Sequence, residues 1–309
     1  MIYFIAPRFN SFISGGNIFN KQIVNALEDL GNSVKQLEYP FRPEFKVHFD
    51  DILVVDSIYV FDLDLNQLAD LACKKYFICH LLPSMIGSGL GVEYEKKVLY
   101  LFDGIIVNSM FCQNVLNSMD LSSEKYIIQP FVDTPTALDQ DDRIKNALLI
   151  ANWLPVKQFA NLLQCLAKQK YLPLTITVIG STEMDPVYFK DCMHIVANSE
   201  LLHDKIHVIG SLGRKEIWSK LVQSEVLLDC SSFETYGMAV AEAVSIGLPV
   251  LTLGNGNTKY LVPPGSICNS IEVLVDRLIH ENWIVPESEY RKKLVTDWDE
   301  FLNQFKVWV

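Results

Sequence analysis

Two glutamates, Glu234 and Glu242, stand with seven residues between them on either side of a glycine that opens an apolar segment. Gly237, Met238 and Ala239 would form the first turn of a helix, where free backbone N–H groups and the positive end of the helix dipole attract an anion. Two nearby carboxylates can accept hydrogen bonds from the hydroxyls of a sugar or a ribose. Together these groups predict a site for a phosphorylated sugar.

Glu242 is the residue whose type fits its neighbours least. It lies among small and apolar residues, where a carboxylate is costly to bury without a partner. In the alternative interpretation neither residue is functional: Glu242 lies on the solvent-exposed face of the helix, and Glu234 lies in an ordinary turn. Both interpretations are open at the level of the residues alone.

The elements that must position these residues follow a repeated pattern. Short apolar runs alternate with amphipathic stretches of roughly ten residues, and Ser109 is well placed as an N-cap. This alternation predicts a mostly parallel sheet covered on both faces. In the first half the expected strands are 2–6, 33–37, 52–55, 76–79, 104–107 and 126–128, and the expected helices are 21–30, 65–74, 93–101 and 109–116.

The polar segment 133–143, with four aspartates and a proline, is the best linker in the chain. After it the alternation restarts, so we expect domains at 1–143 and 144–287, with a C-terminal helical segment at 288–309 that either packs locally or crosses back to tie the domains together. The expected strands are 147–151, 174–179, 205–209, 225–229 and 249–253, and the expected helices are 158–168, 186–201, 214–224 and 237–244.

Composition restricts the class of protein. The 309 residues carry 26 Lys and Arg against 37 Asp and Glu, a net charge of −11, which disfavours nucleic acid and firm adhesion to an anionic membrane. Seven scattered cysteines indicate buried thiols in a reducing compartment. No C-x-x-C or H-E-x-x-H motif occurs and no long apolar run is present, so we expect no metal site and no membrane span.

The spacing Glu234-x-x-Gly237-Met238-x-x-x-Glu242 closely resembles the signature of retaining glycosyltransferases of the GT-B fold, in the large fourth family of nucleotide-sugar-dependent transferases. Weaker similarities extend along most of the chain. They lie at Gly15-Gly16, at 77–80, 105–109 and 128–133, at 151–158, at 208–210 and at 247–250. The resemblance implies an α/β GT-B fold with two Rossmann-like doubly wound domains that face a central cleft, with the acceptor on the first domain and the donor on the second.

Residue by residue, the resemblance implies catalytic roles for three side chains. Glu234 would contact the donor sugar hydroxyls, Lys157 would offer a cation to the departing phosphate, and His80 would line the donor sugar. Without the resemblance, Lys157 is equally a solvated residue that opens a helix, and His80 is equally a satisfied histidine at a strand end.

The remaining implied contacts belong to donor binding. Glu242 would bind the ribose hydroxyls, and Gly237, Met238 and Ala239 would offer N–H groups to the diphosphate. The other donor-binding positions are Gly16, where the backbone could approach the diphosphate or the acceptor, Asn152 in the phosphate-binding segment, and Gly210 beside the nucleobase. Gly16 has a plain turn as its alternative.

One departure from the family pattern matters. The family usually has an arginine where this chain has Asn152, and an amide cannot replace a bidentate guanidinium contact to phosphate. Either Lys157 and the helix terminus suffice, or another cation such as Arg8 substitutes, or turnover is lost.

We therefore expect a metal-independent retaining transferase without a cofactor, which uses a nucleoside diphosphate sugar, UDP- or GDP-linked, and an acceptor of unknown identity. The alternative is a catalytically degenerate GT-B homologue that acts as a binding or partner subunit; an epimerase or phosphorylase on the same scaffold is a further enzyme class. The expected location is cytoplasmic, with the inner face of the membrane as an alternative and at most peripheral membrane contact.

Overall fold

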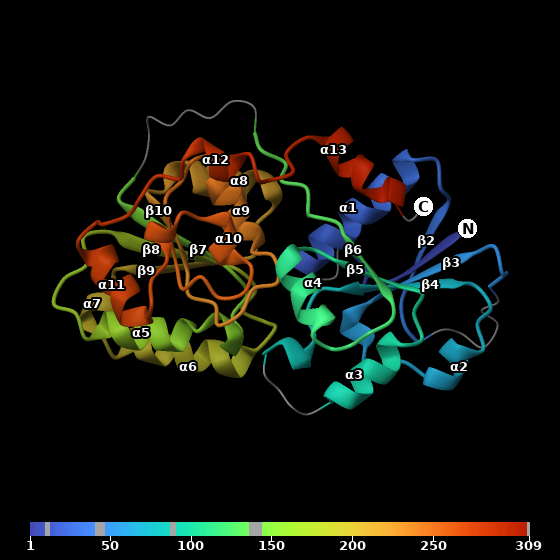
Figure 1. Cartoon of the computed structure of the whole chain (residues 1–309). Coiled ribbons are helices and arrows are strands. Elements are labelled where there is room, and N and C mark those ends of the chain that lie inside the picture. Colours follow the sequence, from blue (N-terminus) through green and yellow to red (C-terminus); the bar gives the residue numbers. More distant parts are fainter. Residues whose placement is uncertain (10–12, 41–46, 87–90, 136–143, 308–309) are drawn as a thin grey trace. The chain divides into compact units, whose positions relative to one another are not determined.

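The computed structural model describes residues 1–9, 13–40, 47–86, 91–135 and 144–307. They form two compact α/β units (Figure 1). Unit 1 consists of Met1–Phe131 and Val295–Val309, and unit 2 of Val132–Leu294. The division after Phe131 comes before the polar segment in which we expected the boundary, and residues 136–143 of that segment lie outside the described residues.

The sheet of unit 1 has six parallel strands in the order β2-β1-β3-β4-β5-β6. Each expected strand of the first half is present within a few residues of its predicted bounds. The strands are β1 (Ile2–Ile5), β2 (Val34–Leu37), β3 (Ile52–Asp56), β4 (Lys74–Cys79), β5 (Gly104–Val107) and β6 (Glu124–Ile127). The central strands are almost wholly buried, as expected for a parallel sheet with helices on both faces.

The helices of unit 1 differ from expectation mainly at their ends. They are α1 (Gly15–Asp29), α2 (Leu65–Ala69), α3 (Val92–Leu99) and α4 (Met110–Asn117), with single 3₁₀ turns at Ser57–Tyr59 and Pro83–Ile86. Ser109 caps α4 as predicted, because its hydroxyl accepts a hydrogen bond from the Cys112 N–H. The glycine pair that we took as a loop instead forms the first turn of α1, since Ser14 is its N-cap. The expected helix 65–74 ends at Ala69 because Lys74 already belongs to β4.

Unit 2 has a five-stranded parallel sheet in the order β11-β10-β7-β8-β9. All five expected strands are present. They are β7 (Asn146–Ile150), β8 (Thr175–Ile179), β9 (Ile206–Gly210), β10 (Val226–Asp229) and β11 (Val250–Thr252). The helices are α5 (Phe159–Ala167), α6 (Pro186–Ala197), α7 (Glu200–His203), α8 (Arg214–Gln223), α9 (Met238–Ser245), α10 (Thr258–Leu261), α11 (Ile271–Ile279) and α12 (Ser288–Arg291), with 3₁₀ turns at Pro155–Lys157 and Pro264–Ser266.

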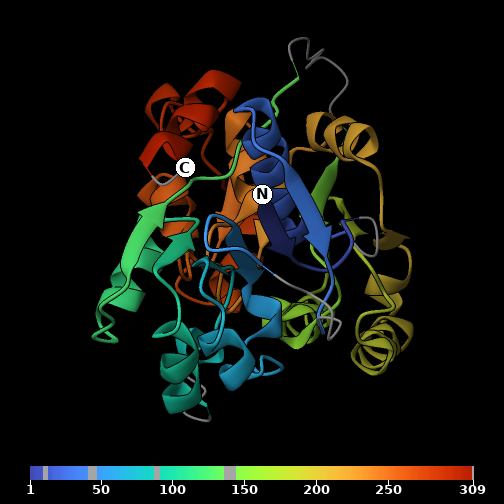
Figure 2. The same cartoon turned by 90° about the vertical axis from the view of Figure 1, so that its right-hand side faces the viewer.

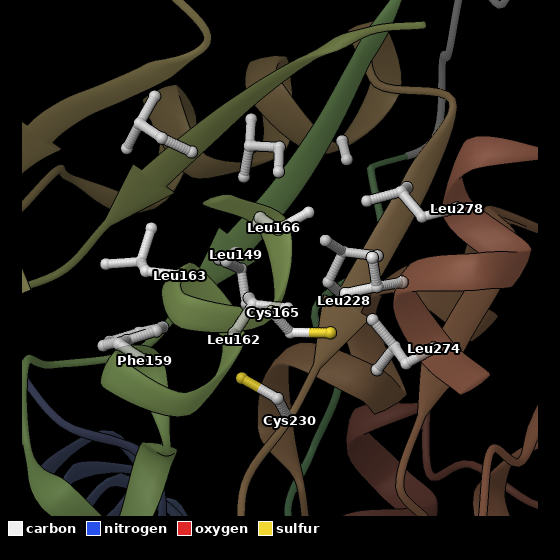
Figure 3. Close-up of a cluster of buried hydrophobic side chains, with 14 of the residues drawn as sticks. Leu149, Phe159, Leu162, Leu163, Cys165, Leu166, Leu228, Cys230, Leu274 and Leu278 are labelled. Atoms are coloured by element: carbon white, nitrogen blue, oxygen red, sulfur yellow. The ribbon is translucent and has the colours of Figure 1, made fainter. Parts of the chain in front are cut away.

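Two hydrophobic clusters cover the two faces of this sheet. Successive side chains of β7 point to opposite faces: Ala147 and Leu149 pack with α5, α6 and α11, whereas Leu148 packs with α8 and α9. Figure 3 shows the first cluster, in which α5 and α11 contribute leucines around Leu149 and Leu228. It also holds the thiols of Cys165 and Cys230, and all seven cysteines of the chain are buried thiols, as predicted.

The last part of the chain, Val295–Val309, belongs to unit 1. The helical segment that we expected from residue 288 onward is not one continuous helix. It is two short helices, α12 and α13 (Trp298–Asn303), followed by a 3₁₀ turn at Gln304–Val307. The helical pattern breaks because Val295 forms a parallel bridge with Phe131 and Asp297 then caps α13. Trp298 donates a hydrogen bond to Asp29 at the end of α1, beside which α13 lies (Figures 1 and 2).

Candidate functional site

The predicted donor-side residues of unit 2 follow the carboxyl ends of its strands, the edge at which open α/β sheets bind ligands. Asn152 comes after β7, Gly210 ends β9, and Glu234 follows β10, which is the neighbour of β7 in the sheet. Sequence reasoning thus expected residues from separate segments to gather at this edge.

Lys157 and Glu234 form an ion pair, which brings together two of the three predicted catalytic residues. Lys157 ends the 3₁₀ turn before α5, and each side chain is only 20% exposed. Burial by itself lowers the pKa of Lys157, but the Glu234 carboxylate more than offsets this, and the pKa is held above its ordinary value. Lys157 is therefore a fixed cation at neutral pH.

Asp229, at the end of β10, is a second carboxylate in this cluster that the sequence analysis did not single out. Its oxygens accept hydrogen bonds from the Ser231 N–H at 3.2 Å and from the Thr252 hydroxyl at 2.8 Å. Burial, and then the charge of Glu234, raise its pKa, while those hydrogen bonds and Lys157 oppose the rise. A signal was present in the sequence, because an aspartate that ends an apolar strand is seldom buried without partners.

The backbone of the Glu234 turn is held from two sides. The Ser232 N–H donates to the Val156 carbonyl at 2.8 Å, which joins the turn to the Lys157 segment. On the other side, the Asn257 N–H donates to the Glu234 carbonyl at 2.8 Å. Gly256 has a φ of +72°, and a Cβ there would lie 2.0 Å from that carbonyl oxygen. The close approach requires glycine, so the segment after β11 fixes where Glu234 stands.

Helix α9 begins as the sequence predicted. Gly237 is its N-cap with a φ of +92°, and a Cβ there would lie 2.7 Å from the Thr258 methyl. No side chain caps this end. The first-turn residues Met238 and Ala239 are half-buried, so their N–H groups lie at a helix end whose dipole favours an anion.

The tertiary structure supplies a partner for the Glu242 carboxylate, which the sequence placed among apolar residues. Glu242 is 3% exposed, and its carboxylate pairs with the guanidinium of Arg214, the first residue of α8. Arg214 also lies over the ring of Trp218 at 5.3 Å. Burial raises the pKa of Glu242, and the charge and hydrogen bond of Arg214 counter that rise. The sequence analysis missed this partner, although Arg214 is the single arginine between residues 144 and 276.

Asn152 and Gly210 form hydrogen bonds that link the loops beside this site. The Asn152 side-chain oxygen accepts a hydrogen bond from the Ser181 N–H at 2.8 Å, and thus ties the segment after β7 to the segment after β8. Gly210 has a φ of +84°, and its carbonyl accepts a hydrogen bond from the Gly180 N–H at 2.9 Å. Neither residue contacts Lys157 or Glu234 through a hydrogen bond recorded among the described residues.

His80 and Gly16 meet within unit 1. His80 directly follows β4, and its imidazole is 15% exposed and lies against the first turn of α1, where a Cβ on Gly16 would come within 3.4 Å of the ring. Its Nε2 contacts Asn20 and Asp56. Arg8, the candidate substitute for the family arginine, instead pairs with Glu38 at 2.8 Å on the surface of unit 1.

Among the described residues, no group of three His, Cys, Asp or Glu side chains is arranged to hold a metal ion. In the same part of the chain, no helix has the length and apolar character to cross a membrane.

Comparisons with known proteins agree with this architecture. Residues 136–287 match the family model of glycosyl transferases group 1. One subunit of the human phosphatidylinositol N-acetylglucosaminyltransferase is 29% identical over 97 residues, which are 28% of this chain and only 20% of that protein. The chain therefore matches a small part of this relative.

Solved structures resemble the chain over nearly its whole length. Sucrose-phosphate synthase from Thermosynechococcus elongatus has a TM-score of 0.76 at 14% identity, with 99% of this chain and 97% of that chain covered. HepE from Anabaena, solved with UDP-glucose, has a TM-score of 0.75 at 12% identity, with 99% and 98% covered. At these identities the likeness concerns the fold. Residues 136–287 thus resemble the group 1 glycosyl transferases, and the two parallel-sheet units have the GT-B fold.

Proposed function

We propose that the protein transfers a sugar from a nucleoside diphosphate sugar to an acceptor hydroxyl with retention of the anomeric configuration. The observation that carries this proposal is the Lys157–Glu234 ion pair, which is followed along the chain by the uncapped N-terminus of α9. A glycosyl–phosphate bond that breaks leaves new negative charge on a diphosphate. Fixed cations and N–H donors stabilise such charge without reorganisation.

Each group of the site has a role in this reaction. Lys157 has three N–H donors, so it can keep Glu234 in place and still donate to a phosphate oxygen of the leaving group. Glu234 would accept hydrogen bonds from the donor sugar, and the N–H groups of Gly237, Met238 and Ala239 would hold the diphosphate. His80 would contact the donor sugar, as the family resemblance implies.

Glu242 would bind the ribose of the donor nucleotide. Its pairing with Arg214 supports this role, because the guanidinium opposes the rise in pKa that burial causes and so favours the ionised carboxylate, which accepts hydroxyl hydrogen bonds. We propose a UDP-linked sugar first and a GDP-linked sugar second, since a structural neighbour was solved with UDP-glucose. The acceptor hydroxyl belongs to a glycan, a lipid or a small molecule.

Thermal unfolding with UDP, GDP, ADP, TDP and their sugar conjugates tests donor binding. A ligand at about 100 times its Kd adds about 2.7 kcal/mol to the free energy of unfolding. We expect a shift with one base that Glu242→Gln abolishes. NMR of the product made from that donor should then give the same anomeric configuration as the donor, and an inverted product would contradict the proposal.

A second candidate function is that of a catalytically degenerate partner subunit. The contact that favours it is the hydrogen bond from the Ser181 N–H to Asn152, because it gives the residue at the family's arginine position a structural task. The human relative, whose name describes one subunit of a transferase, is consistent with this candidate. No thermal shift with any nucleotide, together with binding gained in Asn152→Arg, would favour it over the first.

A further inference from the structure

His80, Asn20 and Asp56 form a polar network at the carboxyl ends of β3 and β4 in unit 1, in which each side chain contacts the other two. His80 Nε2 is 2.8 Å from the Asn20 side-chain oxygen and 3.5 Å from Asp56 Oδ2. Asn20 in turn donates its amide N–H to Asp56 Oδ2 at 2.5 Å. The network joins α1, β3 and β4, and the sequence analysis singled out only its histidine.

Asp56 is held in one orientation by the backbone. Its Oδ1 accepts a hydrogen bond from the Ile58 N–H at 2.8 Å, as the cap of the 3₁₀ turn that follows β3. The Ser57 hydroxyl, 3.5 Å from the same oxygen, accepts a hydrogen bond from the His80 N–H at 3.0 Å. Asp56 is 4% exposed and Asn20 is 0% exposed, so neither side chain turns without breaking buried hydrogen bonds.

The charge of Asp56 fixes the direction of every hydrogen bond in the network. Burial raises the pKa of Asp56, but the charge and hydrogen bond of His80, together with the hydrogen bonds from the Ile58 N–H and the Asn20 amide, more than reverse this, and the pKa lies below its usual value. An ionised carboxylate only accepts, so the Asn20 NH₂ must face Asp56. The Asn20 oxygen then faces His80, and His80 Nε2 must carry a proton.

We propose that Asp56, acting through Asn20, is a positioning residue that keeps the proton of His80 on Nε2 and leaves Nδ1 as the ring atom that meets a substrate hydroxyl. This inference rests on the proposed function, in which His80 contacts the donor sugar.

The surroundings of the ring agree with this assignment. No hydrogen bond to His80 Nδ1 is recorded among the described residues, and the ring is partly exposed. Gly16 leaves room for the ring against the first turn of α1, and Phe19 meets it edge-on at 5.8 Å. The ring is therefore fixed on one side, and its second nitrogen remains for a ligand.

Imidazole ¹⁵N NMR tests the proposal without any donor. In protein with ¹⁵N-labelled histidine, the His80 signals are assigned by their loss in His80→Gln. At a pH where the ring is neutral, we expect its proton on Nε2 in the wild type. In Asp56→Asn the new amide can donate as well as accept, so the Asn20 amide is free to turn, and we expect a large part of the proton to move to Nδ1.

The matched control is Asp51→Asn, which changes another aspartate of unit 1, 7% exposed and paired with the N-terminus. It should leave the His80 signals as in the wild type. If Asp56→Asn does not fold, Asn20→Ala removes the bridge instead, and we expect it to give a mixture of the two tautomers. An unchanged tautomer in whichever of the two variants folds would overturn the proposal.

Kinetics separate this inference from the proposed function. With the donor identified by thermal unfolding, Asp56→Asn should lower kcat by about 10-fold or more with a much smaller change in the donor KM, as expected when an outer partner that orients a ring is lost. Equal loss in Asp51→Asn would overturn the proposal. A tautomer that switches as expected in a protein that turns over no donor would contradict the proposed function alone.

Discussion

At the scale of single residues, the site in unit 2 depends on two ion pairs of different character. Lys157 and Glu234 are both partly exposed, so water and a ligand can reach their charges. The Glu242 side chain is 4% exposed while that of Arg214 is 34% exposed, so loss of the arginine would leave a buried carboxylate without its partner. We therefore expect the first pair to affect turnover most and the second to affect stability as well.

Lys157→Ala should lower kcat by about 10²–10³-fold, which is typical for removal of one group that stabilises developing charge. The measurement is steady-state turnover with the identified donor. Lys190→Ala, which removes an exposed lysine of the same unit, should leave kcat unchanged. If the two variants behave alike, Lys157 does not act on the leaving group.

Arg214→Met should make stability depend on pH in a defined direction. Glu242 already has a raised pKa because of burial, and loss of the guanidinium raises it further. The folded state then binds more protons than the unfolded state between the ordinary glutamate pKa and the folded value, so stability falls as pH rises through that window.

Urea unfolding at pH 5 and pH 7 measures this effect. Arg214→Met should lose more stability relative to the wild type at pH 7 than at pH 5. The double variant Arg214→Met with Glu242→Gln should remove most of the difference between the two pH values, because no carboxyl remains to ionise. A loss that is the same at both pH values would show that Glu242 is not the titrating group.

At the scale of elements, the Glu234 turn is built by segments that are distant in sequence. The 3₁₀ turn before α5 holds it on one side, and the loop between β11 and α10 holds it on the other. That loop can approach so closely because Gly256 has no side chain. The site is therefore fixed by backbone hydrogen bonds between loops, in addition to the ion pair.

Gly256→Ala should lower the free energy of unfolding by more than the strain energy of its left-handed backbone conformation alone. A left-handed non-glycine residue costs about 1–2 kcal/mol, and the added methyl would also displace the Glu234 carbonyl. Gly31→Ala is the matched control, because its φ is +86° and nothing lies within 4 Å of its added Cβ. Thermal unfolding should show the larger loss for Gly256→Ala, and only that variant should lose the shift caused by the donor. Equal losses with donor binding intact would contradict this role of the loop.

At the scale of the whole molecule, the chain leaves unit 1 after Phe131 and returns to it at Val295. The last segment contributes Phe301 and Phe305, each 0% exposed, to the hydrophobic cluster that also contains residues of β1 and α1. Unit 1 is thus completed by residues that follow all of unit 2 in the sequence.

Phe301→Ala should destabilise unit 1 selectively, by about 3–5 kcal/mol as for other buried phenylalanines. Hydrogen exchange followed by mass spectrometry reports the two units separately. We expect faster exchange in α1 and β1 and unchanged exchange in β7 and β8. Phe49→Ala, at a side chain that is 74% exposed, should change neither. Loss of protection in unit 2 instead would contradict the assignment of this segment to unit 1.

Local signals in the sequence were enough for most elements. Buried parallel strands are continuous apolar runs bounded by turn residues, and every expected strand of both sheets is present. Helix starts with a capping side chain, such as Ser109, were equally visible. The helical pattern of the C-terminal segment was misleading. Its aromatic residues pack on unit 1, and nothing in the pattern marks the break in the helix at Val295.

The sequence by itself determined the two α/β units, the position of Glu234 and Glu242 around the start of α9, and the family resemblance, because each depends on residues close together in the chain. Only the tertiary structure decided which groups meet: Arg214 with Glu242, Lys157 with Glu234, and Asp56 with His80 through Asn20. Parallel strands bring their carboxyl ends to one edge from distant segments. The partner of a buried charge is therefore set by strand order and loop geometry, which no local pattern contains.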